Sequence, residues 1–297
     1  MTRHQRAALH QLLRDSPLDL GGDLAVQRPL FEQLLTGHGT PPGVTTSPGR
    51  LGDVPVTWVD VVGTRSGDVL LFLHGGGYAL GSAAGAVGLA AGLAGRAAAR
   101  AVAVDYRLAP EHPFPAALED ALAAYRALLD GGADPRRLAV AGESAGGGLA
   151  VAVLTAARAA GLPQPACAVA LSPWADLTVS GGSAVSRAGA DPVLTAGALR
   201  RRAADYAAGA DPADPRLSPV GADLTGLPPL LVQVGSHEVL LDDALRLAAR
   251  AAHDDVAVTL DVVPGVPHVF QAFAEVLDEG GAALDRAAVF LRAHLGG

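Results

Sequence analysis

Residues 138–146 read LAVAGESAG, an apolar strand that passes through a Gly-x-Ser-x-Gly pentapeptide into a helix of small residues. A serine on so sharp a strand-to-helix turn needs neighbours without bulk, because a larger side chain two positions away would strike the adjoining strand. Gly142 and Gly146 meet that need on either side of Ser144. The pentapeptide alone can arise by chance in a chain with 37 glycines, but its place between strand and helix favours a nucleophile elbow.

A second motif lies upstream of the elbow. The run VLLFL at residues 69–73 is typical of a strand buried on both faces, and it leads into HGGGY at residues 74–78. In hydrolases with such an elbow, this loop supplies backbone N–H groups to the oxyanion, together with the residue after the nucleophile, here Ala145. A glycine triplet alone would indicate a flexible loop. Two motifs in this order favour an oxyanion hole instead.

The general base should follow the nucleophile, since the chain order in α/β hydrolases is nucleophile, acid, histidine. Four histidines follow the elbow: His237, His253, His268 and His294. His253 and His294 lie near the ends of helical stretches, where histidine commonly caps or faces water. His268 follows the strand at 258–263 and the Pro/Gly turn at 264–267, so the sequence predicts it as the base.

The acid should stand at the end of the strand before that histidine. The strand at residues 230–234 leads into GSHE, which places Glu238 at its end and predicts it as the acid. His237 is expected at the rim of the site. Asp242 and Asp243 precede a helix, where they are expected to cap its N-terminus and interact with its dipole.

Four motifs in this order resemble the hormone-sensitive-lipase family of bacterial esterases, part of the α/β-hydrolase superfamily, over most of the chain. They are HGGG at 74–77, DYRLAPE at 105–111, GESAG at 142–146 and PHVF at 267–270. The resemblance implies that Gly76, Gly77 and Ala145 donate N–H groups to the oxyanion. The family's acid is usually the first aspartate of Asp-Pro-Leu-x-Asp, which here reads EVLLD at 238–242. Glutamate thus replaces aspartate, and Asp242 stays open as the alternative acid.

The alternation of strands and helices after residue 66 predicts an α/β fold with a mostly parallel central sheet and helices on both faces. An antiparallel strand is expected within residues 54–62. Residues 46–179 and 215–297 are predicted to form the catalytic core, and residues 1–45 and 180–214 a helical cap. The stretch at 105–111 is expected to act as scaffold, with Asp105 and Arg107 satisfying the local backbone and each other.

Apolar stripes in the N-terminal helices could hold an acyl chain under the cap or simply pack on the core. The arginines at 200–202 are typical of a solvated helix face. Five residues near the motifs are the candidates for the wall of the substrate pocket: Tyr78, Leu80, Trp174, Val193 and Tyr206.

Composition limits the partners and the chemistry. With 297 residues, 50% hydrophobic and 18% charged, the chain suits one globular enzyme. A net charge of −8 argues against nucleic acid and anionic membrane surfaces as partners. Cys167 is the one cysteine, which excludes an intrachain disulfide and a cysteine-rich metal site. We expect no cofactor, no metal and no stable membrane insertion. The absence of a signal-peptide pattern predicts a cytoplasmic location. An edge strand at 258–263 could pair with its twin in a homodimer.

The predicted function is a serine carboxylesterase that hydrolyses short- to medium-chain acyl esters through an acyl-enzyme intermediate. The same apparatus could cleave an amide, a formamide, a carbamate or a lactone. The superfamily also resembles small-molecule receptors that lack the catalytic histidine, and the presence of His268 speaks against that alternative.

Overall fold

The computed structural model describes residues 2–37, 39–64 and 67–296. In these residues one eight-stranded sheet runs in the order β1-β2-β4-β3-β5-β6-β7-β8. The strands are β1 (Val44–Leu51), β2 (Val54–Val61), β3 (Val69–Leu73), β4 (Arg100–Val104), β5 (Leu138–Glu143), β6 (Cys167–Leu171), β7 (Leu230–Gly235) and β8 (Val258–Val263). β2 pairs antiparallel with β1 and β4, and all pairs from β4 to β8 are parallel. The prediction of a mostly parallel sheet with an antiparallel strand at 54–62 is confirmed.

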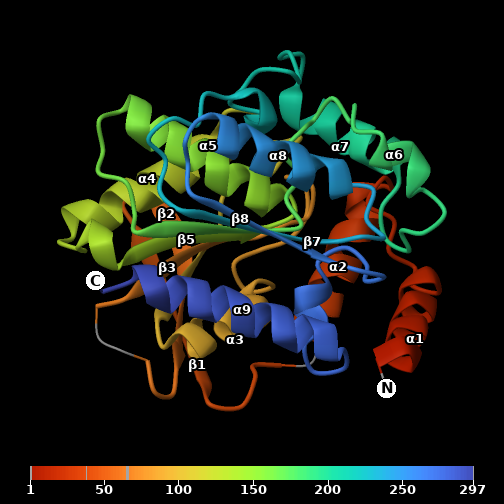
Figure 1. Cartoon of the computed structure of the whole chain (residues 1–297), viewed down its shortest axis with the longest axis horizontal. Helices are drawn as coiled ribbons and strands as arrows, with labels where there is room; N and C mark the ends of the chain where they lie inside the picture. The colour runs from red at the N-terminus through yellow and green to blue at the C-terminus, as the bar shows by residue number, and fades with distance from the viewer. Residues whose placement is uncertain (1, 38, 65–66, 297) are drawn as a thin grey trace.

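Helices cover both faces of the sheet (Figure 1). The helices are α1 (Thr2–Arg14), α2 (Leu24–Thr36), α3 (Val87–Ala97), α4 (Ala116–Asp130), α5 (Ala145–Ala159), α6 (Ser183–Ser186), α7 (Ala196–Ala207), α8 (Leu241–His253) and α9 (Asp278–His294), with short 3₁₀ helices η1 (Pro135–Arg137), η2 (Pro219–Gly221) and η3 (Phe270–Phe273). α3 and α9 lie below the sheet in Figure 1, and α4, α5 and α8 lie above it. This is the α/β-hydrolase arrangement that the motifs predicted.

The alternation of side chains along the strands explains why the sheet needs helices on both faces. In β3, Leu70 and Phe72 enter the core with α3 and α9, whereas Leu71 and Leu73 enter the core with α4, α5 and α8. All four are nearly inaccessible to solvent. β3 is apolar at every position because each face of this strand packs against a hydrophobic core, and its carboxyl end leads into the glycine loop.

The first two helices and the segment of α6 and α7 lie at one side of the molecule, on the right in Figure 1. They touch each other. Arg14 Nη2 donates to the carbonyl oxygen of Gly189 at 3.0 Å. A Cβ atom on Gly21 would lie 3.0 Å from the Cα atom of Ala198 in α7. These contacts join the two segments that the sequence predicted as a helical cap, and the division into cap and core stays a prediction.

The arginine run at 200–202 corrects one expectation. Arg200 and Arg201 are exposed, but Arg202 is only 1% exposed. Successive helical residues are about 100° apart around the axis, since a turn takes 3.6 residues, so three in a row cannot share one face. The prediction of a solvated face was therefore wrong for Arg202. Among the described residues, no helix combines the length and apolarity that crossing a membrane would need.

Candidate active site

Ser144 stands at the turn between β5 and α5, with φ 55° and ψ −121°. A non-glycine residue with positive φ is strained, and such strain is characteristic of functional turns. The turn is tight because a Cβ atom on Gly146 would lie 2.0 Å from the carbonyl oxygen of Leu73. No residue larger than glycine fits there, which is the steric requirement that the pentapeptide predicted. Ser144 is 8% exposed, so its hydroxyl lies in an almost closed site.

The structure brings together the three residues of the predicted triad. His268 Nε2 lies 2.9 Å from Ser144 Oγ, and His268 Nδ1 lies 2.8 Å from Glu238 Oε2. Serine, imidazole and carboxylate thus form one continuous chain of hydrogen bonds, drawn from the ends of β5, β7 and β8. The carboxyl ends of parallel strands meet at the same edge of a sheet, which is why residues 124 positions apart can touch.

Burial and the neighbouring carboxylate act in opposite directions on His268. Burial lowers the pKa of the imidazole, but the hydrogen bond and the negative charge of Glu238 outweigh it, so the pKa of His268 is raised above its ordinary value of 6.5. A stronger base is better suited to take a proton from a serine hydroxyl. Of the other three candidates, His253 and His294 end α8 and α9 as the sequence predicted. His237 is partly buried, with its ring centroid 5.2 Å from that of His10.

Glu238 has no exposed surface, and both of its carboxylate oxygens are used. Oε1 accepts hydrogen bonds from Ser172 Oγ at 2.7 Å and from the N–H of Gly235, while Oε2 faces His268. Burial raises the pKa of this carboxyl, and the three hydrogen bonds counteract the rise. The bond to Gly235 shows that the side chain folds back onto its own strand. This bend accommodates the extra methylene of a glutamate where the family usually has aspartate.

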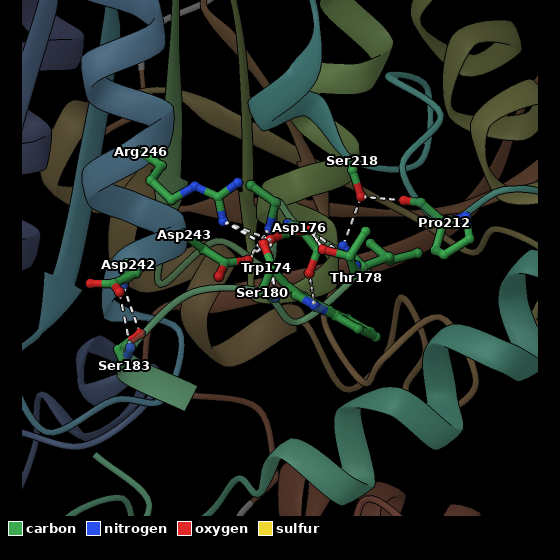
Figure 2. A network of polar contacts seen from close by, with 12 residues as sticks. Trp174, Asp176, Thr178, Ser180, Ser183, Pro212, Ser218, Asp242, Asp243 and Arg246 are labelled. Atoms are coloured by element: carbon green, nitrogen blue, oxygen red, sulfur yellow. Dashed lines mark hydrogen bonds and ion pairs between the residues drawn. The ribbon is translucent and has the colours of Figure 1, made fainter. Parts of the chain in front are cut away.

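The side chains of Asp242 and Asp243 accept hydrogen bonds from the segment after β6 and not from the N-terminus of α8, which corrects their predicted capping role (Figure 2). α8 has no side-chain hydrogen bond at its N-cap. Asp242 Oδ2 accepts the N–H of Ser183 at 2.9 Å. Asp243 Oδ2 accepts the N–H groups of Ala175 and Asp176 at 2.9 and 2.8 Å. Both aspartates thus fasten α8 to the chain after β6, and Glu238, not Asp242, is the carboxylate in contact with His268.

The loop at residues 74–78 is shaped to present backbone N–H groups. Gly76 and Gly77 have φ angles of 107° and 63°, a region that favours glycine. Their N–H groups donate to no acceptor among the residues that the structure describes. Ala145 is the first residue of α5, so its N–H is one of the unused donors of a helix N-terminus. The predicted oxyanion donors are therefore available for a ligand.

Two neighbours hold this loop in place. Glu143 accepts the N–H of Gly75 with its carboxylate, which ties the residue before the nucleophile to the glycine loop. The ring of His74 stacks on Tyr106 at a centroid distance of 4.1 Å, and the Tyr106 hydroxyl donates to the His74 carbonyl oxygen at 2.6 Å. Burial lowers the pKa of His74 to about 4, so this histidine is neutral at pH 7.

The stretch at 105–111 acts as scaffold, although one pairing differs from the prediction. Asp105 Oδ1 accepts the N–H of Ala83 at 2.9 Å, as expected of a carboxylate that satisfies nearby backbone. Arg107 pairs with Asp120 of α4, at 2.8 Å between Nη2 and Oδ1. The expected pair between Asp105 and Arg107 was wrong, because α4 brings a closer carboxylate from outside the motif.

The five candidate pocket residues divide into two groups. Tyr78 and Tyr206 stack with ring centroids 3.9 Å apart, and Trp174 lies 6.0 Å from Tyr78. These rings and Leu80 are almost fully buried, whereas Val193 is partly exposed. The aromatic cluster joins α7 to the glycine loop. Its role as a substrate wall stays a prediction.

Two further residues around the site were missed from the sequence. Ser172 donates to Glu238 and accepts the N–H of Val269 at 3.1 Å, so it links the acid to the histidine loop. The sequence could have indicated Ser172, because it directly follows β6 and therefore lies at the same edge of the sheet as the triad. Arg28 of α2 donates to the carbonyl oxygens of Ala79 and Ala109, which fastens α2 to the end of the glycine loop. No local pattern indicates this contact.

This fold defines the class of the protein. The profile of the family described as alpha/beta hydrolase fold matches residues 70–272. An acetyl-hydrolase from Streptomyces hygroscopicus is 48% identical over 258 residues, which cover 87% of this chain and 85% of that protein. An esterase from Acinetobacter venetianus is 36% identical, with 89% and 87% covered.

Solved structures lead to the same family. A crystal structure of an esterase from the bacterial hormone-sensitive lipase family superposes with a TM-score of 0.94 and 42% sequence identity, covering 99% of both chains. The chain therefore belongs to the α/β-hydrolase family, in its hormone-sensitive-lipase group of esterases, as the four motifs predicted. It is a carboxylic ester hydrolase.

Proposed function

We propose that the protein is a serine carboxylesterase that hydrolyses short- to medium-chain acyl esters through an acyl-enzyme intermediate. The hydrogen-bonded chain from Ser144 through His268 to Glu238 is the single observation that carries this proposal. It contains a nucleophile, a base with a raised pKa and a buried carboxylate in the order that acyl transfer requires.

The reaction begins when Ser144 Oγ attacks the ester carbonyl carbon while His268 Nε2 takes the hydroxyl proton. The carbonyl oxygen becomes an oxyanion, held by the N–H groups of Gly76, Gly77 and Ala145. Each such donor contributes on the order of a hundredfold or more in turnover. The imidazolium then gives its proton to the leaving alkoxide, and the C–O bond of the ester breaks.

Water completes the reaction. His268 takes a proton from a water molecule, whose oxygen attacks the acyl carbon, and returns that proton to Ser144 Oγ as the acid is released. Glu238 stays ionised and stabilises the imidazolium in both halves. These steps need a positioned nucleophile, proton transfer and oriented dipoles, and we propose that no cofactor or metal takes part.

We infer a preference for small acyl groups, with acetyl first. The name of the Streptomyces hygroscopicus relative, acetyl-hydrolase, supports this choice. That name does not specify the leaving group, so an acetyl amide is the second candidate substrate, and formamides, carbamates and lactones follow. Initial rates on p-nitrophenyl esters from acetate to laurate rank the acyl groups, and the rates on matched anilides separate an esterase from an amidase.

Labelling with an organophosphonate tests the serine mechanism. We expect one phosphonyl group per chain on Ser144, detected by mass spectrometry of peptides, with loss of esterase activity in proportion. The Ser144→Ala variant should neither react nor turn over esters. A wild-type protein that hydrolyses esters without being labelled would refute the mechanism. A receptor with the same fold should neither react nor hydrolyse.

The remaining expectations are also proposals. β8 forms an edge of the sheet, and Leu260 and Val262 on it are exposed, which supports pairing of two copies into a homodimer. Light scattering of the purified protein tests this. The absence of nucleic acid as a partner and the cytoplasmic location stay predictions, to be tested by binding assays and by cell fractionation.

A further inference from the structure

Arg202 is a buried cation directly beside the proposed oxyanion loop. It lies on α7 of the cap and is 1% exposed. A Cβ atom on Gly77 would lie 3.0 Å from Arg202 Cγ and 3.4 Å from Leu20 Cδ1. The stem of Arg202 therefore packs against the glycine loop, where α7, the N-terminal segment and the core meet.

The guanidinium of Arg202 is incompletely paired. Nη2 lies 2.9 Å from Asp205 Oδ2, one turn along the same helix. Nε and Nη1 are buried without a hydrogen-bond partner among the described residues. Three N–H donors, one on Nε and two on Nη1, are thus left without an acceptor. Burying such donors unsatisfied is unfavourable, so a residue with a purely structural role would be expected to use them.

Arg28 shows what a structural arginine looks like in the same region. Its Nε donates to Ala79, its Nη2 to Ala109 and Glu111, and its Nη1 to Glu111, at distances of 2.6 to 2.9 Å. Every nitrogen of that guanidinium has an acceptor. The Arg202 side chain is more buried than that of Arg28, and fewer of its guanidinium nitrogens have an acceptor.

We propose that Arg202 binds a carboxylate carried by the substrate, so that the preferred esters are half-esters of dicarboxylic acids or esters with an acidic group. This proposal rests on the proposed function, since it assigns a substrate class to the same site. A guanidinium is permanently charged, and it binds carboxylates through charge-assisted hydrogen bonds. The stem of Arg202 packs against Gly77 of the proposed oxyanion loop, and for this reason we assign its free donors to a substrate that this loop would hold.

The electrostatics around Arg202 agree with an anionic ligand. Burial lowers the pKa of Arg202, and Arg201 and Arg28 lower it further, while Asp205 and Asp19 partly compensate. The protein therefore stabilises this charge incompletely. A substrate carboxylate would supply the missing negative charge as well as the acceptors for the unused donors.

The test compares monomethyl esters of succinate, glutarate and adipate with the corresponding neutral dimethyl esters. Wild-type enzyme should prefer the acidic ester of one chain length in kcat/KM. In Arg202→Met this preference should fall about tenfold or more, mainly through KM, the loss expected for a charge-assisted hydrogen bond. Hydrolysis of the dimethyl esters should change less than about threefold. Arg201→Met removes an exposed charge from the same helix and is the matched control, expected to keep the preference.

Several outcomes would overturn the proposal. An equal fall on acidic and neutral esters would assign Arg202 a structural role, and an unchanged preference would remove it from the substrate site. If Arg202→Met does not fold, competitive inhibition of p-nitrophenyl acetate hydrolysis decides on wild-type enzyme. Glutarate should inhibit and neutral glutaramide should not, whereas equal or absent inhibition refutes the proposal. Absence of turnover by the wild-type enzyme on acidic and neutral esters alike would instead refute the proposed function.

Discussion

Replacing Glu238 by glutamine tests the site most sharply, because the change alters charge and hydrogen bonding with little change in shape. The two oxygens of Glu238 accept from three donors: Ser172 Oγ and the Gly235 N–H at Oε1, and His268 Nδ1 at Oε2. A glutamine has only one oxygen, so its NH₂ group must face a donor at one of these two positions.

The preferred orientation follows from counting the lost bonds. An NH₂ group at the Oε1 position opposes two donors, and each lost hydrogen bond with a buried polar group costs about 1–3 kcal/mol. At the Oε2 position it opposes only His268, which can respond by moving its proton from Nδ1 to Nε2. The glutamine therefore places its oxygen at Oε1 and its NH₂ group against the imidazole. His268 then carries its proton on the nitrogen that faces Ser144 and cannot accept another.

We expect kcat of Glu238→Gln to fall by about 10³ to 10⁴, as for a triad held in the wrong tautomer, with the melting temperature nearly kept. Initial rates on p-nitrophenyl acetate and circular dichroism melting measure the two quantities. Asp242→Asn is the control, expected to keep most of the activity because Asp242 binds Ser183 instead. A loss below tenfold in Glu238→Gln, or a larger loss in Asp242→Asn, would refute the assignment of the acid.

The other predictions concern pH and packing. His268 is the base only when neutral, and its pKa is raised above 6.5, so kcat/KM should be full above that pKa and fall at lower pH, with the inflection above pH 6.5. The residual activity of Glu238→Gln should show this inflection at lower pH, and an unmoved inflection would assign it to another group. Gly146→Ala should lower stability by about 3 kcal/mol in denaturant titrations, because the new methyl group has no room at the elbow; unchanged stability would contradict that geometry. Burial lowers the pKa of His10 and His237, whose ring centroids lie 5.2 Å apart, so the unfolded chain binds protons more readily than the folded chain. Stability should therefore be complete above pH 6.5 and decline below it. Replacing both by glutamine should reduce that decline, and His74, whose pKa burial lowers to about 4, should account for the decline that remains.

Much of the fold could be predicted because its signals are local. The apolar run at 69–73 and the small residues around Ser144 depend on neighbours a few positions away in the chain. The order of the motifs then indicated which strand ends meet. His268 could be selected among four histidines because two of the others end helices, a property that is also visible in the local pattern.

The sequence by itself determined the elbow, the glycine loop and the parallel sheet, since steric limits on the backbone and the alternation of apolar residues act over short distances. Only the tertiary structure decided between the carboxylates. Glu238 and Asp242 stand four positions apart, but Glu238 contacts His268 whereas Asp242 binds Ser183, and both contacts come from distant parts of the chain. The burial of Arg202 was likewise decided in three dimensions, because Leu20 and Gly77 come together over it only when distant segments of the chain pack.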